Sequence, residues 1–226
     1  MQKVVLITGA SSGLGKEIAK LFQAKNYILI LSGRNEKGFE EFDSSNIEKV
    51  IGDITLKKTR NKIVDLVKNK YKRLDILINN AGIGLIQPFE KNTEEQLNKI
   101  LEINLKAPIL LTQALYDVMK TQQFGTIVFI NSTSGKQGYP NHTLYATTKF
   151  GLSGFAQSLR QEAKKYGIRV ISIHPGGIKT NLYNKLSEKP DISNYMDAKK
   201  VAEIVVYLSE TSNLSPDEIV INRITK

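Results

Sequence analysis

The sequence predicts an α/β protein with one doubly wound, seven-stranded parallel sheet flanked by helices. Short apolar runs alternate with longer segments of helical period along the chain, which is the pattern of a parallel sheet covered on both faces. A glycine-rich turn, from Gly9 to Gly15, directly follows the first apolar run. A length of 226 residues without an internal repeat or linker favours one large domain, residues 1–226. In such a sheet, ligands bind beyond the carboxyl ends of the strands.

Seven short apolar runs bounded by turn residues are expected to be strands. They are residues 4–8, 27–32, 47–51, 75–79, 126–131, 169–174 and 218–222. The segments between them have apolar residues at helical spacing and are expected to be helices. They are residues 13–24, 35–42, 56–71, 94–104, 108–120, 144–166 and 198–209. Pro108 suits a first helical turn, where its missing N–H matters least, so the stretch after Thr93 is expected to form two helices.

The composition is that of an ordinary globular protein and excludes several kinds of site. Hydrophobic residues make up 41% of the chain and charged residues 24%, which argues against disordered, collagen-like and coiled-coil structures. The absence of cysteine excludes disulfides, thiolate metal sites and a cysteine nucleophile. Two histidines, His142 and His174, cannot fill a multi-histidine zinc site. We therefore expect no metal centre, and we interpret His174 as structural and His142 as a loop residue beside the site.

The net charge of +10 does not decide the partner. An excess of basic residues fits a polyanion, small anionic molecules or solubility alone. The densest basic stretch, residues 57–73, is interpreted as a solvated helix face, because it has one aromatic residue and no nucleic-acid motif. The amino terminus is apolar for only four residues, too short for a signal-peptide core or a membrane span. We expect a cytoplasmic protein without nucleic-acid or membrane partners.

The turn Gly9-Ala10-Ser11-Ser12-Gly13-Leu14-Gly15 lies between a predicted strand and a predicted helix. Glycines let the backbone turn sharply and approach a ligand closely. The first turn of the following helix offers free N–H groups and the positive end of its dipole, which together bind a pyrophosphate. This placement favours a site for a phosphate-bearing cofactor over a plain loop.

The spacing Gly-x-x-x-Gly-x-Gly resembles that of the short-chain dehydrogenase/reductase family, and further motifs of that family follow in order. These are Asn79-Asn80-Ala81-Gly82, Asn104, Ser132, Tyr145-Ala146-Thr147-Thr148-Lys149 and Pro175-Gly176. The resemblance covers about residues 3–180. It implies a Rossmann fold, a nicotinamide cofactor and an enzyme that reversibly reduces a ketone or aldehyde to an alcohol.

Tyr145 and Lys149 carry the expected chemistry. Four positions apart on a helix, they lie on one face, so the lysine ammonium can approach the phenol. A free tyrosine has a pKa near ~10, and a nearby positive charge is expected to lower the pKa of Tyr145 so that it can shuttle protons. The resemblance implies that Tyr145 is the general acid and base and that Ser132 orients the substrate oxygen. It also implies that Asn104 positions a water that links Lys149 to solvent.

No carboxylate follows the second predicted strand, where many dinucleotide sites place one to bind the ribose 2′-hydroxyl. The sequence there is Leu31-Ser32-Gly33-Arg34-Asn35, and an arginine can pair with a 2′-phosphate. We therefore expect NADP(H) to be preferred, with NAD(H) possible. The resemblance extends the cofactor site to further positions. The full predicted set is Gly9, Ser11, Ser12, Gly13, Leu14, Gly15, Arg34, Asp53, Ile54, Asn80, Ala81, Gly82, Tyr145, Lys149, Pro175, Gly176, Ile178 and Thr180.

The substrate is expected to be a small carbonyl or alcohol compound whose identity the sequence leaves open. The expected pocket walls are residues 83–89, 137–142 and 182–196, and a short lid is expected over residues 180–199. Their apolar and tyrosine side chains suit a partly apolar compound. Three lysines in the lid segment or beside it can also attract an anionic substrate. They are Lys179, Lys185 and Lys189.

Three functional interpretations stay open. The first is an NADP(H)-dependent carbonyl reductase. The second is a non-catalytic NADP(H)-binding regulator or redox sensor on the same fold, which is disfavoured because it needs none of Ser132, Tyr145 and Lys149. The third is an RNA-binding or scaffolding protein that uses the basic face of residues 57–73. The resemblance also implies a homodimer or homotetramer paired through the helices 108–120 and 144–166.

Overall fold

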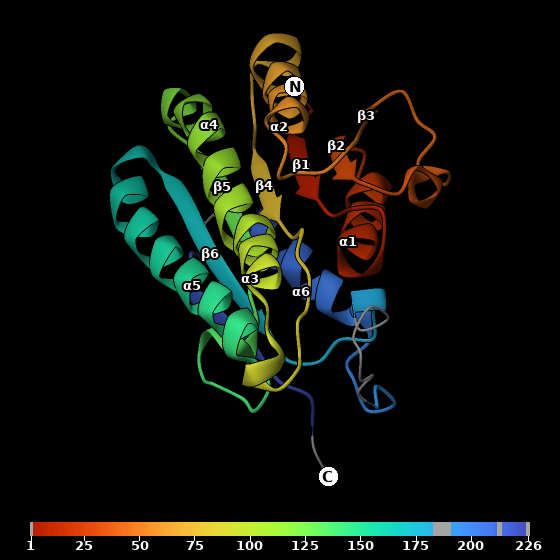
Figure 1. The fold of residues 1–226 in the computed structure, drawn as a ribbon. Coiled ribbons are helices and arrows are strands. Elements are labelled where there is room, and N and C mark those ends of the chain that lie inside the picture. The colour runs from red at the N-terminus through yellow and green to blue at the C-terminus, as the bar shows by residue number, and fades with distance from the viewer. Residues whose placement is uncertain (1, 183–190, 212–213, 225–226) are drawn as a thin grey trace.

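The computed structural model describes residues 2–182, 191–211 and 214–224, and these residues form a seven-stranded parallel sheet flanked by helices (Figure 1). The strands are β1 (Val4–Thr8), β2 (Ile28–Gly33), β3 (Ile47–Ile51), β4 (Ile76–Asn79), β5 (Gly125–Ile130), β6 (Ile168–Pro175) and β7 (Glu218–Ile221). Their order is β3-β2-β1-β4-β5-β6-β7, with every pairing parallel. The predicted fold class is confirmed, and each predicted strand end agrees to within one residue.

Two layers of helices cover the sheet. The α-helices of the described residues are α1 (Gly13–Ala24), α2 (Lys57–Asp65), α3 (Glu94–Leu101), α4 (Ala107–Gln122), α5 (Thr143–Ala163) and α6 (Ala198–Glu210). Alternate strand residues point to opposite faces, so that in β2 the side chains of Leu29 and Leu31 join one core while Ile30 joins the other. The first core packs against α1 and α6, and the second packs against α2, α4 and α5 (Figure 1).

The predicted helix over residues 35–42 is wrong. Only a short 3₁₀ turn, η1 (Glu36–Phe39), forms there. Gly38 lies so close to the glycine-rich turn that a Cβ on it would be 2.1 Å from the Ser11 carbonyl oxygen. This contact between segments far apart in the chain holds the backbone in place, and a central glycine weakens any competing helix.

Two of the predicted helices change their winding before they end. Residues 56–71 form α2 and then a π-helical segment, η2 (Leu66–Tyr71). The stretch after Thr93 forms α3 and α4 as expected, but a π-helical segment, η4 (Glu102–Lys106), joins them without a break. Pro108 lies in the first turn of α4, as expected. Because proline has no N–H to donate to the preceding turn, Pro108 accounts for the change from α-helical to π-helical winding in η4, just before it.

The basic stretch of residues 57–73 presents its lysines to solvent and its apolar side chains to the sheet. The residues buried there are Thr59, Ile63 and Val67. The lysines of this stretch are therefore solvent-exposed, as expected of a helix face, and the absence of a nucleic-acid partner for it stays a prediction. Among the described residues, no helix combines the length and apolar character needed to cross a membrane.

Candidate active site

A cavity of about 1310 Å³ opens where the parallel strands end, and it gathers nearly all of the predicted site residues. Those that line it are Gly9, Ser11, Ser12, Gly13, Leu14, Arg34, Asp53, Ile54, Asn80, Ala81, Gly82, Ser132, Tyr145, Lys149, Pro175, Gly176, Ile178 and Thr180. Gly15 and Asn104 do not line the cavity, although both contact residues that do. Residues that lie far apart in the chain therefore meet in one site.

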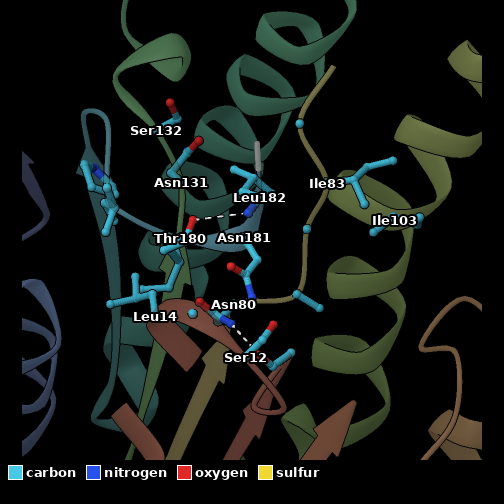
Figure 2. A pocket seen from close by; sticks show the side chains of 18 of the residues that line it. Ser12, Leu14, Asn80, Ile83, Ile103, Asn131, Ser132, Thr180, Asn181 and Leu182 are labelled. Atoms are coloured by element: carbon cyan, nitrogen blue, oxygen red, sulfur yellow. Dashed lines mark hydrogen bonds between the residues drawn. The ribbon is translucent and has the colours of Figure 1, made fainter. Parts of the chain in front are cut away.

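The glycine-rich turn is shaped by close backbone contacts. Gly9 has a φ of +67°, and a Cβ on it would lie 2.9 Å from the Ala81 Cα. A Cβ on Gly15 would lie 2.4 Å from both the Gly9 carbonyl oxygen and the Asn80 Nδ2. Gly13 also has a positive φ, and Thr180 lies against it from the opposite wall (Figure 2). The turn accepts no side chain at these positions, which leaves its backbone open to a ligand.

Thr8 and Asn80 tie this turn to the end of β4. The Asn80 Nδ2 donates to the carbonyl oxygens of Thr8 at 2.9 Å and Gly9 at 3.2 Å. The Thr8 hydroxyl accepts hydrogen bonds from the backbone N–H groups of Asn80 and Ala81, at 3.0 and 3.1 Å. Thr8 was not in the predicted set, and only its place at the end of β1 could have marked it.

The region after β2 fits a phosphate better than a ribose hydroxyl. Arg34 is exposed at the cavity wall, and a Cβ on Gly33 would lie 2.7 Å from the Ser11 hydroxyl oxygen. Asp53 follows the neighbouring strand β3. Burial opposes ionisation of Asp53, but hydrogen bonds from Thr55 and the charges of Arg34 and Lys99 outweigh it and lower the pKa of Asp53. The glycine cradle and the exposed guanidinium together suit a phosphorylated dinucleotide.

Ser132, Tyr145 and Lys149 come together on the opposite side of the cavity. Ser132 precedes the 3₁₀ turn η5 (Thr133–Gly135), and its hydroxyl hydrogen-bonds the Tyr145 side chain. Tyr145 and Lys149 lie one turn apart on α5, with the lysine Nζ 5.6 Å from the tyrosine ring centroid. The Lys149 Nζ donates to the Ile130 carbonyl oxygen at 3.1 Å. Figure 2 shows Asn131 and Ser132 at one wall, with Ile83 and Ile103 at the other.

The direction predicted for the pKa of Tyr145 is wrong. Burial raises the pKa of Tyr145 above its ordinary value, and the hydrogen bond with Ser132 offsets this only in part. Burial lowers the pKa of Lys149 to about 8, because the charged ammonium loses water. Tyr145 therefore keeps its proton at neutral pH, which suits a group that must donate it.

Asn104 supports the wall of the cavity. It is 1% exposed, and its Oδ1 accepts a hydrogen bond from the Ile83 N–H at 2.8 Å. Its Nδ2 donates to the Ile83 carbonyl oxygen at 2.9 Å and to the Thr148 hydroxyl at 3.3 Å. These contacts fix the backbone beside the substrate end, and the water-positioning role of Asn104 stays a prediction.

The two histidines differ in the way expected. His174 is fully buried with its Nδ1 3.1 Å from the Ser132 carbonyl oxygen, and burial lowers the pKa of His174. His142 lies at the cavity wall, and its Nδ1 is 2.7 Å from the Pro140 carbonyl oxygen.

Within residues 2–182, 191–211 and 214–224, no group of three acidic or histidine side chains is arranged to hold a metal ion.

Comparison with known proteins identifies the family. Residues 3–191 match the family described as short chain dehydrogenase. This chain belongs to that family. It is similar to the sepiapterin reductase of Chlorobaculum tepidum, with 27% identity over 234 residues that cover 98% of this chain and 96% of that protein. As a short chain dehydrogenase it is an oxidoreductase.

Two solved structures show the same architecture. The structure of ElxO with NADP bound has 27% identity and a TM-score of 0.86, and the match covers 98% of both chains. The 3-ketoacyl-(acyl-carrier-protein) reductase from Brucella melitensis, complexed with NADH, has 26% identity and a TM-score of 0.89 over 97% of this chain and 96% of that one. These neighbours agree with the cofactor prediction for this short chain dehydrogenase, NADP(H) preferred and NAD(H) possible.

The substrate end of this short chain dehydrogenase combines expected and unexpected residues. The expected walls contribute Ile83, Gly84, Ile86, Tyr139, His142, Leu182 and Tyr195. Residues 183–190, with Lys185 and Lys189, lie outside the described residues. Lys179 lines a separate surface groove with Glu17 and Asp197. Sequence reasoning missed Asn222 and Arg223, although they directly follow a strand that was predicted to end at this edge.

Proposed function

We propose that this chain is an NADP(H)-dependent carbonyl reductase that reversibly converts a ketone or aldehyde to an alcohol, with Tyr145 as general acid and base. One observation carries the proposal: Ser132, Tyr145 and Lys149 share a cavity with the glycine-rich turn and Arg34. A non-catalytic NADP(H)-binding regulator needs the turn but has no use for the three polar side chains at the other side of the cavity.

The proposed chemistry follows from the protonation of these side chains. The reduced nicotinamide, when bound, supplies the hydride for the carbonyl carbon. Tyr145 stays protonated because burial raises its pKa, so its hydroxyl donates a proton to the carbonyl oxygen. The Ser132 hydroxyl, held beside the Tyr145 side chain, hydrogen-bonds the same oxygen and orients it. Lys149 then returns a proton towards Tyr145, because its pKa of about 8 leaves it mostly charged at neutral pH.

The choice of NADP(H) rests on the residues that the cavity offers at its far end. The glycine cradle and the first turn of α1 would hold the pyrophosphate. The Arg34 guanidinium would bind the 2′-phosphate, and the segment Gly33-Arg34-Asn35 carries no carboxylate to favour a free hydroxyl. ElxO, a structural neighbour, has NADP bound.

The test follows NADPH and NADH absorbance with a panel of aldehydes, ketones, dicarbonyls and 3-oxoesters. Tyr145→Phe is expected to lose about 10² to 10⁴ of the turnover rate, the usual share of general acid catalysis, while NADPH binding measured by fluorescence is unchanged. Tyr166→Phe is the matched control, because Tyr166 follows α5 and does not line the cavity. NADPH binding without turnover of any carbonyl would favour the regulator, and a fully active Tyr145→Phe would contradict the proposed acid.

We also propose that the protein is a homodimer or homotetramer. Phe150 of α5 supports this assembly, because its large apolar side chain is 47% exposed. Light scattering should then give a mass of two or four times 25.3 kDa, and Phe150→Lys should lower it. We further propose a cytoplasmic location and no nucleic-acid partner. Cell fractionation checks the location, and the absence of salt-sensitive RNA binding checks the partner.

A further inference from the structure

Two exposed arginines stand at opposite ends of the cavity. Arg34 follows β2, near one edge of the sheet, and Arg223 follows β7, at the other edge. The catalytic Ser132 follows β5, which lies between them in the strand order. The proposed function gives Arg34 a phosphate of the cofactor, and it gives Arg223 nothing to bind.

Arg223 belongs to the substrate end because of its neighbours. The backbone N–H of Gly176 donates to the Ile221 carbonyl oxygen at 2.9 Å, which fixes the end of β7 beside the segment after β6. A Cβ on Gly176 would lie 3.8 Å from the Asn222 Oδ1. β6 leads directly to Gly176, and His174 of β6 has its Nδ1 3.1 Å from the Ser132 carbonyl oxygen. The chain therefore reaches Arg223 from the side of the cavity where Ser132 lies.

The Arg223 side chain stacks on the ring of Tyr195, which is itself packed against the chain. Its guanidinium carbon lies 5.1 Å from the centroid of the Tyr195 ring, a cation–π geometry. The Tyr195 ring in turn covers Gly177, where a Cβ would lie only 2.6 Å from the ring. The Met196 N–H donates to the Gly177 carbonyl oxygen at 2.9 Å and holds the two segments together. Stacking of this kind positions the flat guanidinium group and leaves its N–H donors free for another partner.

The charges around the cavity leave Arg223 available for an anion. The other Lys, Arg, Asp and Glu side chains that line it are Arg34, Asp53 and Lys149. Asp53 contacts Thr55 and is influenced by Arg34, at the other end of the cavity. Glu218, the acidic residue of β7, is paired with Lys136. Across the described ranges, no carboxylate lies within ion-pair distance of Arg223.

We propose that Arg223 binds an anionic group on the substrate, so that the preferred substrates are oxocarboxylates rather than neutral ketones or aldehydes. This inference rests on the proposed function. A guanidinium group presents paired N–H donors that match the two oxygens of a carboxylate. The Tyr195 ring provides an apolar surface beside it for the carbon chain between the carboxylate and the reacting carbonyl. A phosphate offers the same oxygens, and the experiment separates the two anions.

The test compares matched acids and esters. 2-Oxobutanoate, acetoacetate and levulinate, each beside its methyl ester, are reduced with saturating NADPH by the wild type, Arg223→Gln and Arg223→Lys. For at least one pair, the wild type should show a kcat/KM ratio of acid to ester above about 10, the factor equivalent to about 1.4 kcal/mol. Arg223→Gln should bring this ratio close to 1 through the KM of the acid, with ester turnover kept. Lys165→Gln, a loss of charge at a residue that lines neither the cavity nor the neighbouring groove, should leave the ratio unchanged.

Binding measurements separate this inference from the proposed function. Calorimetry with 3-hydroxybutanoate, its methyl ester and glycerol 3-phosphate, in the presence of NADP⁺, needs no turnover. Acid binding that is lost in Arg223→Gln would support the inference even if no carbonyl is reduced. An equal response of acid and ester to the substitution, or no preference for any acid in either measurement, would overturn it. Tighter binding of the phosphate than of the carboxylate would overturn the assignment to oxocarboxylates.

Discussion

The two ends of the cavity are built in different ways. At the cofactor end, Gly9, Gly15 and Gly38 pack so closely that a Cβ on any of them would come within 3 Å of another segment's backbone or side chain. At the substrate end, Tyr139 lines the cavity and is exposed, and a Cβ on the adjacent Gly138 meets nothing within 4 Å. The cofactor end is thus defined by backbone packing, while the substrate end is defined by side chains on loops. Substrate preference can therefore change without disturbing the sheet.

Adding one methyl group near each end of the cavity tests whether the two ends are packed differently, and this test has the largest expected effect. Gly15→Ala places a Cβ 2.4 Å from the Gly9 carbonyl oxygen, so the glycine-rich turn must move. We expect NADPH affinity to fall by about a hundredfold or more and the protein to lose about 1–3 kcal/mol of stability, as overpacked sites do. Fluorescence titration and denaturant unfolding measure the two effects.

Gly138→Ala is the matched control. It adds the same methyl group in open space, at a glycine without a positive φ. Its stability should stay within about 0.5 kcal/mol of the wild type, and its NADPH affinity should be unchanged. If Gly138→Ala weakens NADPH binding as much as Gly15→Ala, the two ends are not built differently.

A change of pH should act at the catalytic side of the cavity. Burial lowers the pKa of Lys149 to about 8, so Lys149 is charged below pH 8 and loses its proton as the pH rises beyond it. Tyr145 keeps its proton over this range, because burial raises its pKa. Carbonyl reduction should therefore slow above pH 8, by up to about tenfold per pH unit, in a profile of kcat against pH.

Lys149→Arg tests the assignment of this pH dependence. An arginine stays charged throughout the range, so the decline above pH 8 should disappear even if the variant is slower. A wild-type rate that is constant up to pH 10 would show that the charge of Lys149 does not limit the reaction.

The smallest expected effect concerns the choice of cofactor. If Arg34 binds the 2′-phosphate as proposed, Arg34→Gln removes one charged partner of that group. The KM for NADPH should then rise about tenfold, as for a charge-assisted hydrogen bond of about 1.5 kcal/mol. The KM for NADH should stay the same. Lys37→Gln, an exposed neighbour that does not line the cavity, serves as the control. Equal changes for both cofactors would argue against a 2′-phosphate contact at Arg34.

The sequence by itself determined the sheet and most of the cavity lining. Each strand is a short apolar run between turn residues, a local signal that the tertiary structure does not override. The glycine-rich turn and the spacing of Tyr145 and Lys149 are also local, because a strand-to-helix turn and one turn of a helix each fix their geometry within a few residues. The carboxyl ends of parallel strands meet at one edge, so residues that follow strands could be assigned to one site in advance.

Only the tertiary structure decided the features that depend on contacts between distant segments. The predicted helix over residues 35–42 fails because Gly38 packs on Ser11. The pKa of Tyr145 is raised because burial, which spacing along a helix does not reveal, outweighs its hydrogen bond with Ser132. Arg223 joins the cavity because β7 pairs with β6 at the sheet edge. Burial and packing between distant segments arise only in the folded chain, so local sequence patterns do not predict them directly.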